Sequence, residues 1–229
     1  VLIFDKELYK NRIPDHPGGG TVLWTNPWGE HSYIDDIEVR EDGGTPGVLQ
    51  SIKAAMAILL KERMGVEHIR KREQDLVRKA FHGFGDIPGL HVLAGDRMER
   101  LGVFSLYIED VHHNLVVKLL NDRFGIQVRG GCSCAGTYGH YLLHVTRETS
   151  EQITTRINQG DLSMKPGWVR ISLHPTTTDE ELEYIVCALK AVVHNVGKWQ
   201  KDYRYDPATG EFVSLLHAQP VQVNVLDGF

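Results

Sequence analysis

The sequence predicts an α/β protein in which an open sheet is covered by helices. Strand-like runs are mixed along the chain with longer segments whose apolar residues recur at helical spacing. The chain has 229 residues, of which 41% are hydrophobic and 24% are charged. These values are typical of a soluble globular protein with one large domain or two smaller ones.

The first part of the chain combines two strand-like runs with turns. Residues 1–4 and 21–25 are predicted to be strands, and the glycine triplet at 18–20 favours a turn between them. Residues 27–36 are predicted to form a loop. A natural N-terminus seldom begins inside a strand, so we expect further sequence before Val1.

The first long helix is predicted to begin at Thr45 and Pro46. Threonine is a good N-cap, and proline is favoured at the first helical position. Apolar residues then recur along one helical face, namely Val48, Leu49, Ile52, Ala55, Met56, Leu59 and Leu60. Gly65 ends this helix, and the next helix, predicted at residues 66–84, is far more charged. This change in composition indicates a domain boundary near Gly65.

Beyond that boundary, strands and helices alternate. Strands are predicted at residues 90–94, 103–109, 126–129 and 168–173, and helices at residues 112–124 and 150–158. The last helix begins at a capping box formed by Thr178 and Glu181. From about Tyr203 the chain loses its periodicity, so we expect a tail there.

Charge, hydropathy and cysteine content exclude several classes of protein. A formal net charge of -5 gives no basic surface for nucleic acid. No apolar run approaches the roughly 18 residues that span a bilayer, and no signal peptide is visible. The odd, low count of 3 cysteines argues against a disulfide scaffold and for a reducing compartment, for which the cytoplasm is the default.

An arginine, two glycines and a thiol follow each other in the middle of the chain. Strand alternation places Gln127 and Arg129 on one face, and Cys134 comes five residues after Arg129. A guanidinium near a thiol stabilises the reactive thiolate. A helix beginning after Cys134 would stabilise the thiolate further through its N-terminal amides. The alternative is that Cys134 is a small buried apolar residue.

Four soft ligands, Cys132, Cys134, His140 and His144, offer a zinc site as a second alternative. Zinc sites usually separate paired cysteines by two to four residues, and here only one residue intervenes. A disulfide between Cys132 and Cys134 would close a very tight ring. The sequence therefore favours free thiols and no metal.

Two further features are suited to binding anions. Arg170 lies on a predicted strand, from which its guanidinium can hold a carboxylate bidentately. Gly43 and Gly44 lead into the predicted helix start at Thr45, where free amides and the positive end of the helix dipole would face a phosphate. The alternatives are an arginine on a solvated strand face and a simple turn.

Four segments together resemble the class V aminotransferase family of fold-type I enzymes that depend on pyridoxal phosphate. They are Gly18-Gly19-Gly20-Thr21, residues 40–46, residues 129–135 and Trp168-Val169-Arg170. Within the family, the resemblance is to the cysteine desulfurase and selenocysteine lyase branch. It implies that residues 1–65 end a large cofactor-binding domain and contact a second subunit, that residues 66–205 form a small C-terminal domain whose mostly antiparallel sheet is covered by helices, and that residues 206–229 are a tail.

The resemblance also implies roles for individual residues in a homodimeric enzyme acting on an amino acid. Thr45, with Gly44 beside it, would contact the phosphate of pyridoxal 5'-phosphate from the neighbouring subunit. Arg170 would hold the substrate carboxylate, and Arg129 would help to orient the substrate. Cys134 would attack the substrate sulfur and become a persulfide, from which a sulfur-acceptor protein could be served.

The sequence departs from that branch in two ways. Cys132 and Ser133 stand where the branch usually has two histidines, and Thr137 stands where it usually has a proline. The lysine that forms the Schiff base follows a histidine in this family, and the chain contains no His-Lys pair. We therefore expect this chain alone to be inactive. An aminotransferase or epimerase of the same fold, and a non-catalytic module for dimerisation or for thiol or metal binding, remain as alternatives.

Overall fold

The computed structural model describes residues 2–132 and 134–216. The chain divides into two compact units, residues 1–66 and 67–229. Helices and antiparallel sheets occur in a mixed α/β arrangement, which confirms the predicted fold class. Within the described ranges, no helix is long and apolar enough to cross a bilayer.

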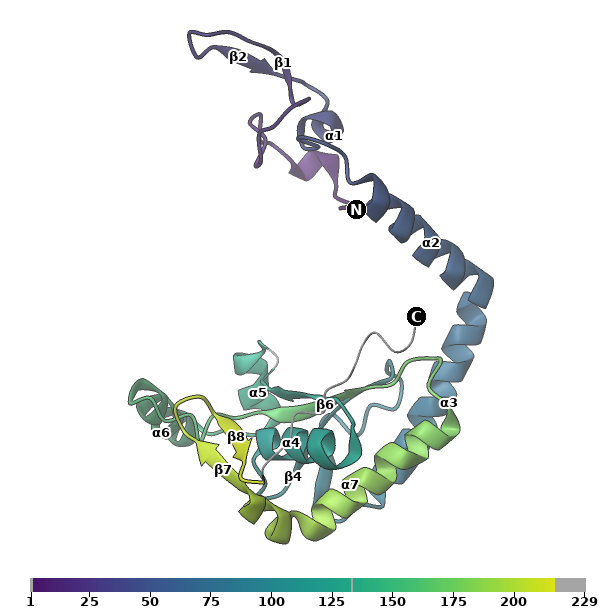
Figure 1. Cartoon of the computed structure of the whole chain (residues 1–229), viewed down its shortest axis with the longest axis vertical. Coiled ribbons are helices and arrows are strands. Elements are labelled where there is room, and N and C mark those ends of the chain that lie inside the picture. The colour runs from purple at the N-terminus through teal and green to yellow at the C-terminus, as the bar shows by residue number, and fades with distance from the viewer. Residues whose placement is uncertain (1, 133, 217–229) are drawn as a thin grey trace. The chain divides into compact units, whose positions relative to one another are not determined.

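The first unit contains a hairpin and three helical segments. A 3-10 helix, η1 (Lys6–Leu8), precedes the antiparallel strands β1 (Val22–Thr25) and β2 (His31–Tyr33) (Figure 1). The short α1 (Ile37–Arg40) and the long α2 (Val48–Met64) follow. The prediction of a loop at residues 27–36 is therefore wrong for β2, which β1 stabilises by pairing. The strand predicted at residues 1–4 is wrong for residues 2–4, which have no regular structure, and Val1 lies outside the described residues.

The predicted start of α2 is wrong by two residues. The helix begins at Val48 and its N-cap is Gly47, whose φ of -73° and ψ of 66° are those of an inverse γ-turn. In that turn the Val48 amide donates to the Pro46 carbonyl at 2.8 Å. Thr45 is therefore not the N-cap of the helix.

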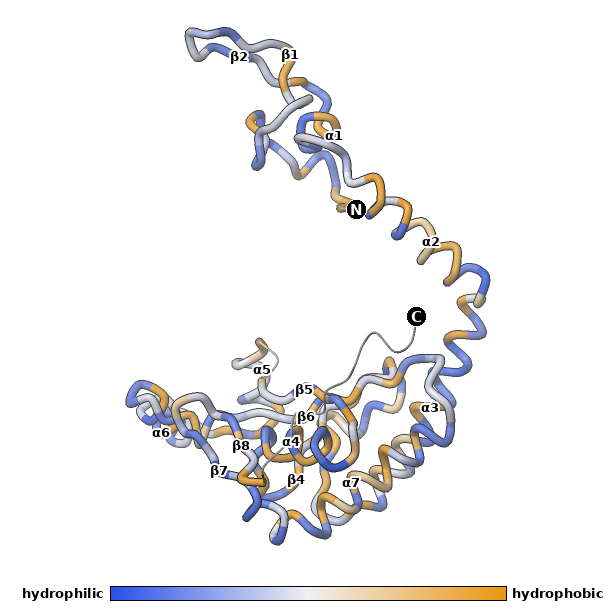
Figure 2. Tube along the Cα trace, in the orientation of Figure 1, coloured by the Kyte–Doolittle hydropathy of each residue, from blue (hydrophilic) through white to orange (hydrophobic). Residues whose placement is uncertain are grey.

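The apolar face of α2 is exposed. Leu49 is 73% exposed and Met56 is 64% exposed, and orange residues recur along this helix in Figure 2. The hydrophobic core draws no described residue from the first unit. The first unit is organised instead around Arg40, which is buried. Its guanidinium donates to the carbonyls of Asn11, Ile34 and Asp35 at 2.9–3.0 Å.

The second unit is built on a four-stranded antiparallel sheet. Its strands lie in the order β3 (Leu90–Val92), β4 (Val103–Ile108), β6 (Trp168–Ser172) and β5 (Arg129–Gly131). Strand β5 is thus an edge strand. Residues 126–129 were predicted to be the strand, but the Ile126 amide instead donates to the Leu120 carbonyl at the end of the preceding helix, where Gly125 has a φ of 66°.

Three helices contribute to the core on one face of this sheet. They are α3 (Val66–Gly85), α4 (His113–Phe124) and α7 (Asp179–Trp199), and α7 begins with the predicted capping box of Thr178 and Glu181. Phe104 of β4 packs edge-on against Phe81 and Phe84 of α3, with ring centroids 5.2 Å apart in both pairs. Burial of these side chains supplies the hydrophobic stabilisation of the unit.

The remaining elements flank the sheet. Helix α5 (Gly136–Leu142) follows β5, and α6 (Arg147–Asn158) begins three residues before its predicted start because Thr146 is its N-cap. After η2 (Gln200–Asp202), β7 (Tyr203–Asp206) and β8 (Glu211–Ser214) form an antiparallel hairpin. The prediction of an irregular tail from Tyr203 is therefore wrong for residues 203–214, and residues 217–229 lie outside the described part.

Candidate active site

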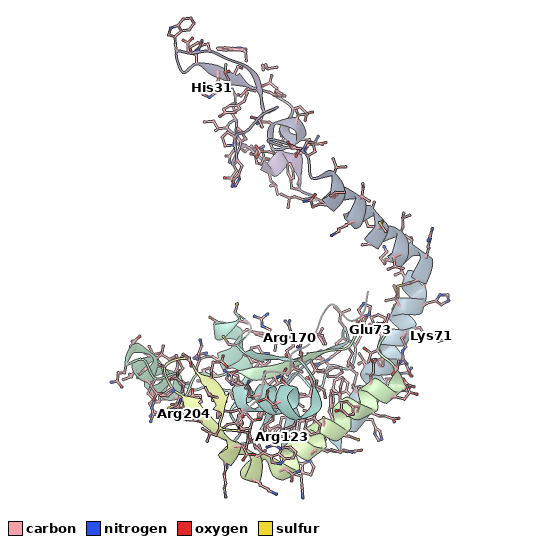
Figure 3. The ribbon with its side chains drawn as sticks, in the orientation of Figure 1. His31, Lys71, Glu73, Arg123, Arg170 and Arg204 are labelled. Atoms are coloured by element: carbon pink, nitrogen blue, oxygen red, sulfur yellow. The ribbon has the colours of Figure 1, made fainter. Side chains whose placement is uncertain are left out.

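Two arginines face each other across neighbouring strands of the second unit. Arg129 of β5 is the direct register partner of Arg170 of β6, so both side chains lie on the same face of the sheet. The flanking residues Val169 and Ile171 are buried in the core on the opposite face. Figure 3 shows Arg170 on the side of the sheet away from α4.

The two guanidinium groups have no protein partner among the described residues. The Nε of Arg170 is buried without a hydrogen-bond partner, and neither arginine side chain forms an ion pair or hydrogen bond with the described residues. Like charges directly opposite in a sheet are destabilising, and an unmet buried donor adds to that cost. An anion placed between them would remove both costs, so this pair is suited to a carboxylate.

The indole of Trp168 and helix α5 lie beside the arginine pair. Trp168 of β6 is buried, although its strand position places it on the same face as Arg170. A Cβ on Gly139 of α5 would lie 3.1 Å from the Trp168 ring, so the helix packs closely on the indole. Helix α5 therefore covers part of the sheet face that carries the arginines.

Glycine is required at positions 130 and 131 for two different structural reasons. A Cβ on Gly130 would lie 2.7 Å from Asn114 Oδ1 and 2.8 Å from the Val117 side chain, so glycine allows β5 to approach α4. Gly131 has a φ of 109°, which side-chain-bearing residues rarely adopt. Together they place the thiol-bearing loop directly after the arginine strand.

Cys134 is exposed in a tight turn. Its φ is 58°, in the left-handed region that costs a non-glycine residue roughly 1–2 kcal/mol. The Ala135 amide donates to the Cys132 carbonyl at 2.9 Å, and α5 begins at Gly136, so a helix does start after Cys134. Ser133 lies outside the described residues.

Both ring nitrogens of His140 are engaged, Nδ1 within α5 and Nε2 with α6. Nδ1 lies 2.9 Å from the Gly136 carbonyl, which can only accept, so Nδ1 carries the hydrogen. Nε2 therefore accepts from the Ser150 hydroxyl at 3.0 Å. With both nitrogens engaged, His140 has no lone pair free for zinc. No group of three or more histidine, cysteine or acidic side chains within the described ranges is arranged for a metal ion.

In the first unit, the two glycine clusters of the sequence contact each other. The Gly44 amide donates to the Gly19 carbonyl at 2.8 Å, and a Cβ on Gly43 would lie 2.8 Å from the His16 carbonyl oxygen. This contact could not be read from the sequence. It also means that the Gly44 amide is already engaged, whereas Thr45 is exposed and no hydrogen bond of its hydroxyl occurs among the described residues.

Comparison with known proteins places the chain in a family. The model of the aminotransferase class-V family matches residues 1–185, so the chain belongs to that family. A probable cysteine desulfurase of Staphylococcus aureus is 30% identical, over 69% of this chain and 40% of the relative. A probable cysteine desulfurase of Staphylococcus epidermidis is also 30% identical, over 59% of this chain and 32% of the relative. The chain thus spans at most about 40% of the length of these curated relatives.

Solved structures share the fold over a similar part of their length. A cysteine desulfurase from Thermococcus onnurineus in its apo form has a TM-score of 0.59 and 24% identity, over 80% of this chain and 40% of that chain. A cysteine desulfurase from Escherichia coli has a TM-score of 0.57 and 18% identity, over 80% of this chain and 39% of that chain. A C-DES variant with glycine covalently linked to its PLP cofactor has a TM-score of 0.53 and 17% identity, over 77% of this chain and 37% of that chain.

Proposed function

We propose that this chain supplies the carboxylate-binding and thiol-bearing part of a pyridoxal-phosphate enzyme that acts on an amino acid, of the cysteine desulfurase or selenocysteine lyase type. The observation that carries the proposal is the pair Arg129 and Arg170, whose side chains have no partner among the described residues and which the loop of Cys134 directly follows along β5. The cysteine desulfurases among its relatives support the same activity.

Each of these residues has a chemical role in that reaction. Arg170 binds the substrate carboxylate with two parallel hydrogen bonds, and Arg129 shares the negative charge and orients the substrate. Cys134, as a thiolate, attacks the substrate sulfur with its electron pair. The new S–S bond leaves a persulfide on Cys134, and the electron pair of the broken C–S bond stays with the substrate carbon.

The chain provides part of a pyridoxal-phosphate site. The Thr45 hydroxyl has no hydrogen bond among the described residues, and the amides of Leu49 and Gln50 precede the first hydrogen bond of α2, which Ser51 donates to Gly47. These groups suit a phosphate. The amide of Gly44 already donates to the Gly19 carbonyl, so Gly44 would contribute to the phosphate site only by leaving space for it. When bound, pyridoxal phosphate supplies an electron sink for carbanion chemistry. The 229 residues contain no His-Lys pair to hold it, so we expect no turnover by this chain alone.

The same proposal includes a homodimer and a protein that accepts the sulfur. The exposed apolar face of α2 supports a contact with a second subunit, because large exposed apolar surfaces commonly mark interfaces. Cys132, Cys134 and Cys187 are free thiols, which supports a reducing compartment such as the cytoplasm.

Carboxylate binding can be tested on the chain itself. The unfolding temperature is measured with L-alanine and with ethylamine, which lacks only the carboxylate. We expect L-alanine to stabilise the chain and ethylamine to have no effect. Arg170→Met should abolish the stabilisation, whereas Arg147→Met on α6, which pairs with Glu151 at 3.1 Å, should keep it. Equal stabilisation by both compounds would refute the assignment of the arginine pair.

The transfer of sulfur to Cys134 distinguishes the proposed desulfurase from an aminotransferase or epimerase of the same fold. That alternative is favoured by Cys132 and Thr137, where the sequence departs from the desulfurase pattern. A protein that joins this chain to the lysine-bearing part of the family is incubated with L-cysteine, and Cys134 is examined by mass spectrometry. We expect one added sulfur on Cys134 and no sulfide release in Cys134→Ser. Turnover of the amino acid without sulfur on Cys134, and unchanged in Cys134→Ser, would favour the alternative.

A further inference from the structure

A small cavity lies beside the same loop and has no role in the function proposed above. Its volume is about 220 Å³, and its lining includes Cys132, His112, His113, Lys165 and Glu211. Gly130, which approaches α4 closely, also lines it. The cavity thus brings one thiol together with two imidazoles and an ammonium group.

The two imidazoles are stacked and uncharged. Their ring centroids are 4.4 Å apart, and burial lowers the pKa of His113 to about 4 and also lowers the pKa of His112. The Asn114 amide donates to Nδ1 of His112 at 3.1 Å, so the hydrogen of His112 is on Nε2. Nε2 is buried and has no hydrogen-bond partner among the described residues. His112 therefore retains an unused donor.

The two thiols of the loop differ in exposure. Cys132 is half-buried and lines the cavity, whereas Cys134 is exposed. They are two residues apart, so their Cα atoms are separated by no more than about 7 Å. The bond from the Ala135 amide to the Cys132 carbonyl folds this segment into a turn. A sulfur atom carried on Cys134 therefore has a second thiol within short reach.

We propose that Cys132 is a second sulfur-carrying site, which takes the terminal sulfur from a persulfide on Cys134 and holds it at the cavity of His112, His113 and Lys165. The proposal rests on the function proposed above, in which Cys134 becomes the persulfide. It assigns the protein a stored form of sulfur on a half-buried thiol.

The transfer is balanced without an added oxidant or reductant. The Cys132 thiolate attacks the terminal sulfur of the Cys134 persulfide, a new S–S bond forms, and the old S–S bond breaks. The Cys134 sulfur leaves with the electron pair as a thiolate, so one persulfide and one thiolate are present before and after. Attack on the inner sulfur would instead release hydrosulfide and close the strained Cys132–Cys134 ring.

The lining of the cavity favours retention of the transferred sulfur. A persulfide anion on Cys132 would be an acceptor for charge-assisted hydrogen bonds. Lys165 and His112, whose Nε2–H has no partner among the described residues, are two of the donor-bearing residues that line the cavity with it. The carboxylate of Glu211 would repel a persulfide anion, and the ammonium of Lys165 would offset that repulsion. Loss of Lys165 should therefore weaken retention of the sulfur most.

The relay can be tested on the purified chain with inorganic polysulfide, which loads exposed thiols without any cofactor. Sulfur on each cysteine is followed over time by alkylation and mass spectrometry. In the wild type we expect sulfur on Cys134 first and on Cys132 afterwards. In Cys134→Ser, loading of Cys132 should fall at least tenfold, while the exposed Cys187 loads as in the wild type. Equal loading of Cys132 in both proteins would overturn the relay, and so would a Cys132–Cys134 disulfide with free sulfide.

A second variant tests retention. Lys165→Met should shorten the lifetime of sulfur on Cys132 several-fold and leave that on Cys187 unchanged, and an unchanged lifetime on Cys132 would contradict the role of the cavity. Because polysulfide bypasses the amino-acid reaction, the two proposals can fail separately. If L-cysteine places no sulfur on Cys134 in the lysine-bearing protein but polysulfide sulfur still moves to Cys132, only the proposed function fails.

Discussion

Replacement of Arg170 by methionine should stabilise the unliganded second unit. The substitution keeps an unbranched side chain of similar length, and it removes one of two like charges that face each other across β5 and β6. It also removes Nε, a buried donor without a partner among the described residues. Most substitutions at partly buried positions destabilise a protein, so the expected sign is unusual.

The size of the effect follows from these two contributions. Relief of a directly opposed like-charge pair contributes about 0.2–1 kcal/mol. Removal of an unmet buried donor contributes about 1–3 kcal/mol, and we take the lower end because the side chain of Arg170 is only half-buried. We therefore expect the free energy of unfolding to rise by about 1–2 kcal/mol, which for a unit of this size raises the melting temperature by about 2–8 °C.

The assay is urea denaturation followed by near-ultraviolet circular dichroism, to which the buried Trp168 contributes. Arg123→Met is the matched control. Arg123 also has a buried Nε without a partner among the described residues, but it pairs with Asp202 at 2.5 Å and lies 4.4 Å from the Trp199 ring centroid. Loss of the ion pair and the cation–π contact costs about 0.5–2 kcal/mol and removal of Nε returns about 1 kcal/mol, so that variant should not gain stability and should lose up to about 1 kcal/mol. Destabilisation by Arg170→Met similar to that of the control would refute the claim that the arginine pair is unfavourable without a ligand.

Three further predictions concern the loop and the cavity. Gly130→Ala should destabilise by about 1–3 kcal/mol in denaturation experiments, because its Cβ would lie 2.7 Å from Asn114 Oδ1, whereas Gly136→Ala, with no neighbour within 4 Å, should be neutral or stabilising. Cys134→Gly should be more stable than Cys134→Ala by about 0.5–1 kcal/mol, since only glycine relieves the φ of 58°, and equal stabilities would contradict this strain. His113 has a pKa of about 4 in the fold against 6.5 when unfolded, so the unfolded chain takes up the proton first as pH falls. Stability should therefore drop between pH 6.5 and 4, by at most about 3 kcal/mol, and pH-dependent melts of His113→Phe should show a shallower slope.

Elements defined by local chemistry were the most predictable from the sequence. The capping box of Thr178 and Glu181 lies within four residues of the helix start, so the beginning of α7 could be predicted and is confirmed. Strands that are stabilised mainly by pairing with a neighbouring strand were not predicted from the sequence. Strand β2 depends on β1, and the hairpin of β7 and β8 depends on the turn that the Gly210 amide closes on the Asp206 carbonyl at 2.8 Å. Neither carries a hydrophobic periodicity long enough to identify a strand.

The candidate site shows the same division between local and non-local information. Alternation along each strand allowed Arg129 and Arg170 to be placed on strand faces, but their direct opposition depends on the register between β5 and β6. The contact between Gly19 and Gly44 was not predictable, because nothing in either glycine cluster specifies the other. The stacking of His112 and His113 was not predictable from the sequence either, since it follows from the tertiary structure. The roles of Cys134, Arg129, Arg170, Thr45 and Gly44 stay predictions.

The position of β5 at the edge of the sheet has a dynamic consequence. The strand has three residues, two of them glycines, and pairs on one side only, so it should be among the first parts of the second unit to open locally. A carboxylate that bridges Arg129 and Arg170 would fasten this edge to β6. Amide hydrogen exchange at β5 would then slow on binding, so the strand that leads to Cys132 would be held in place when the thiols are needed.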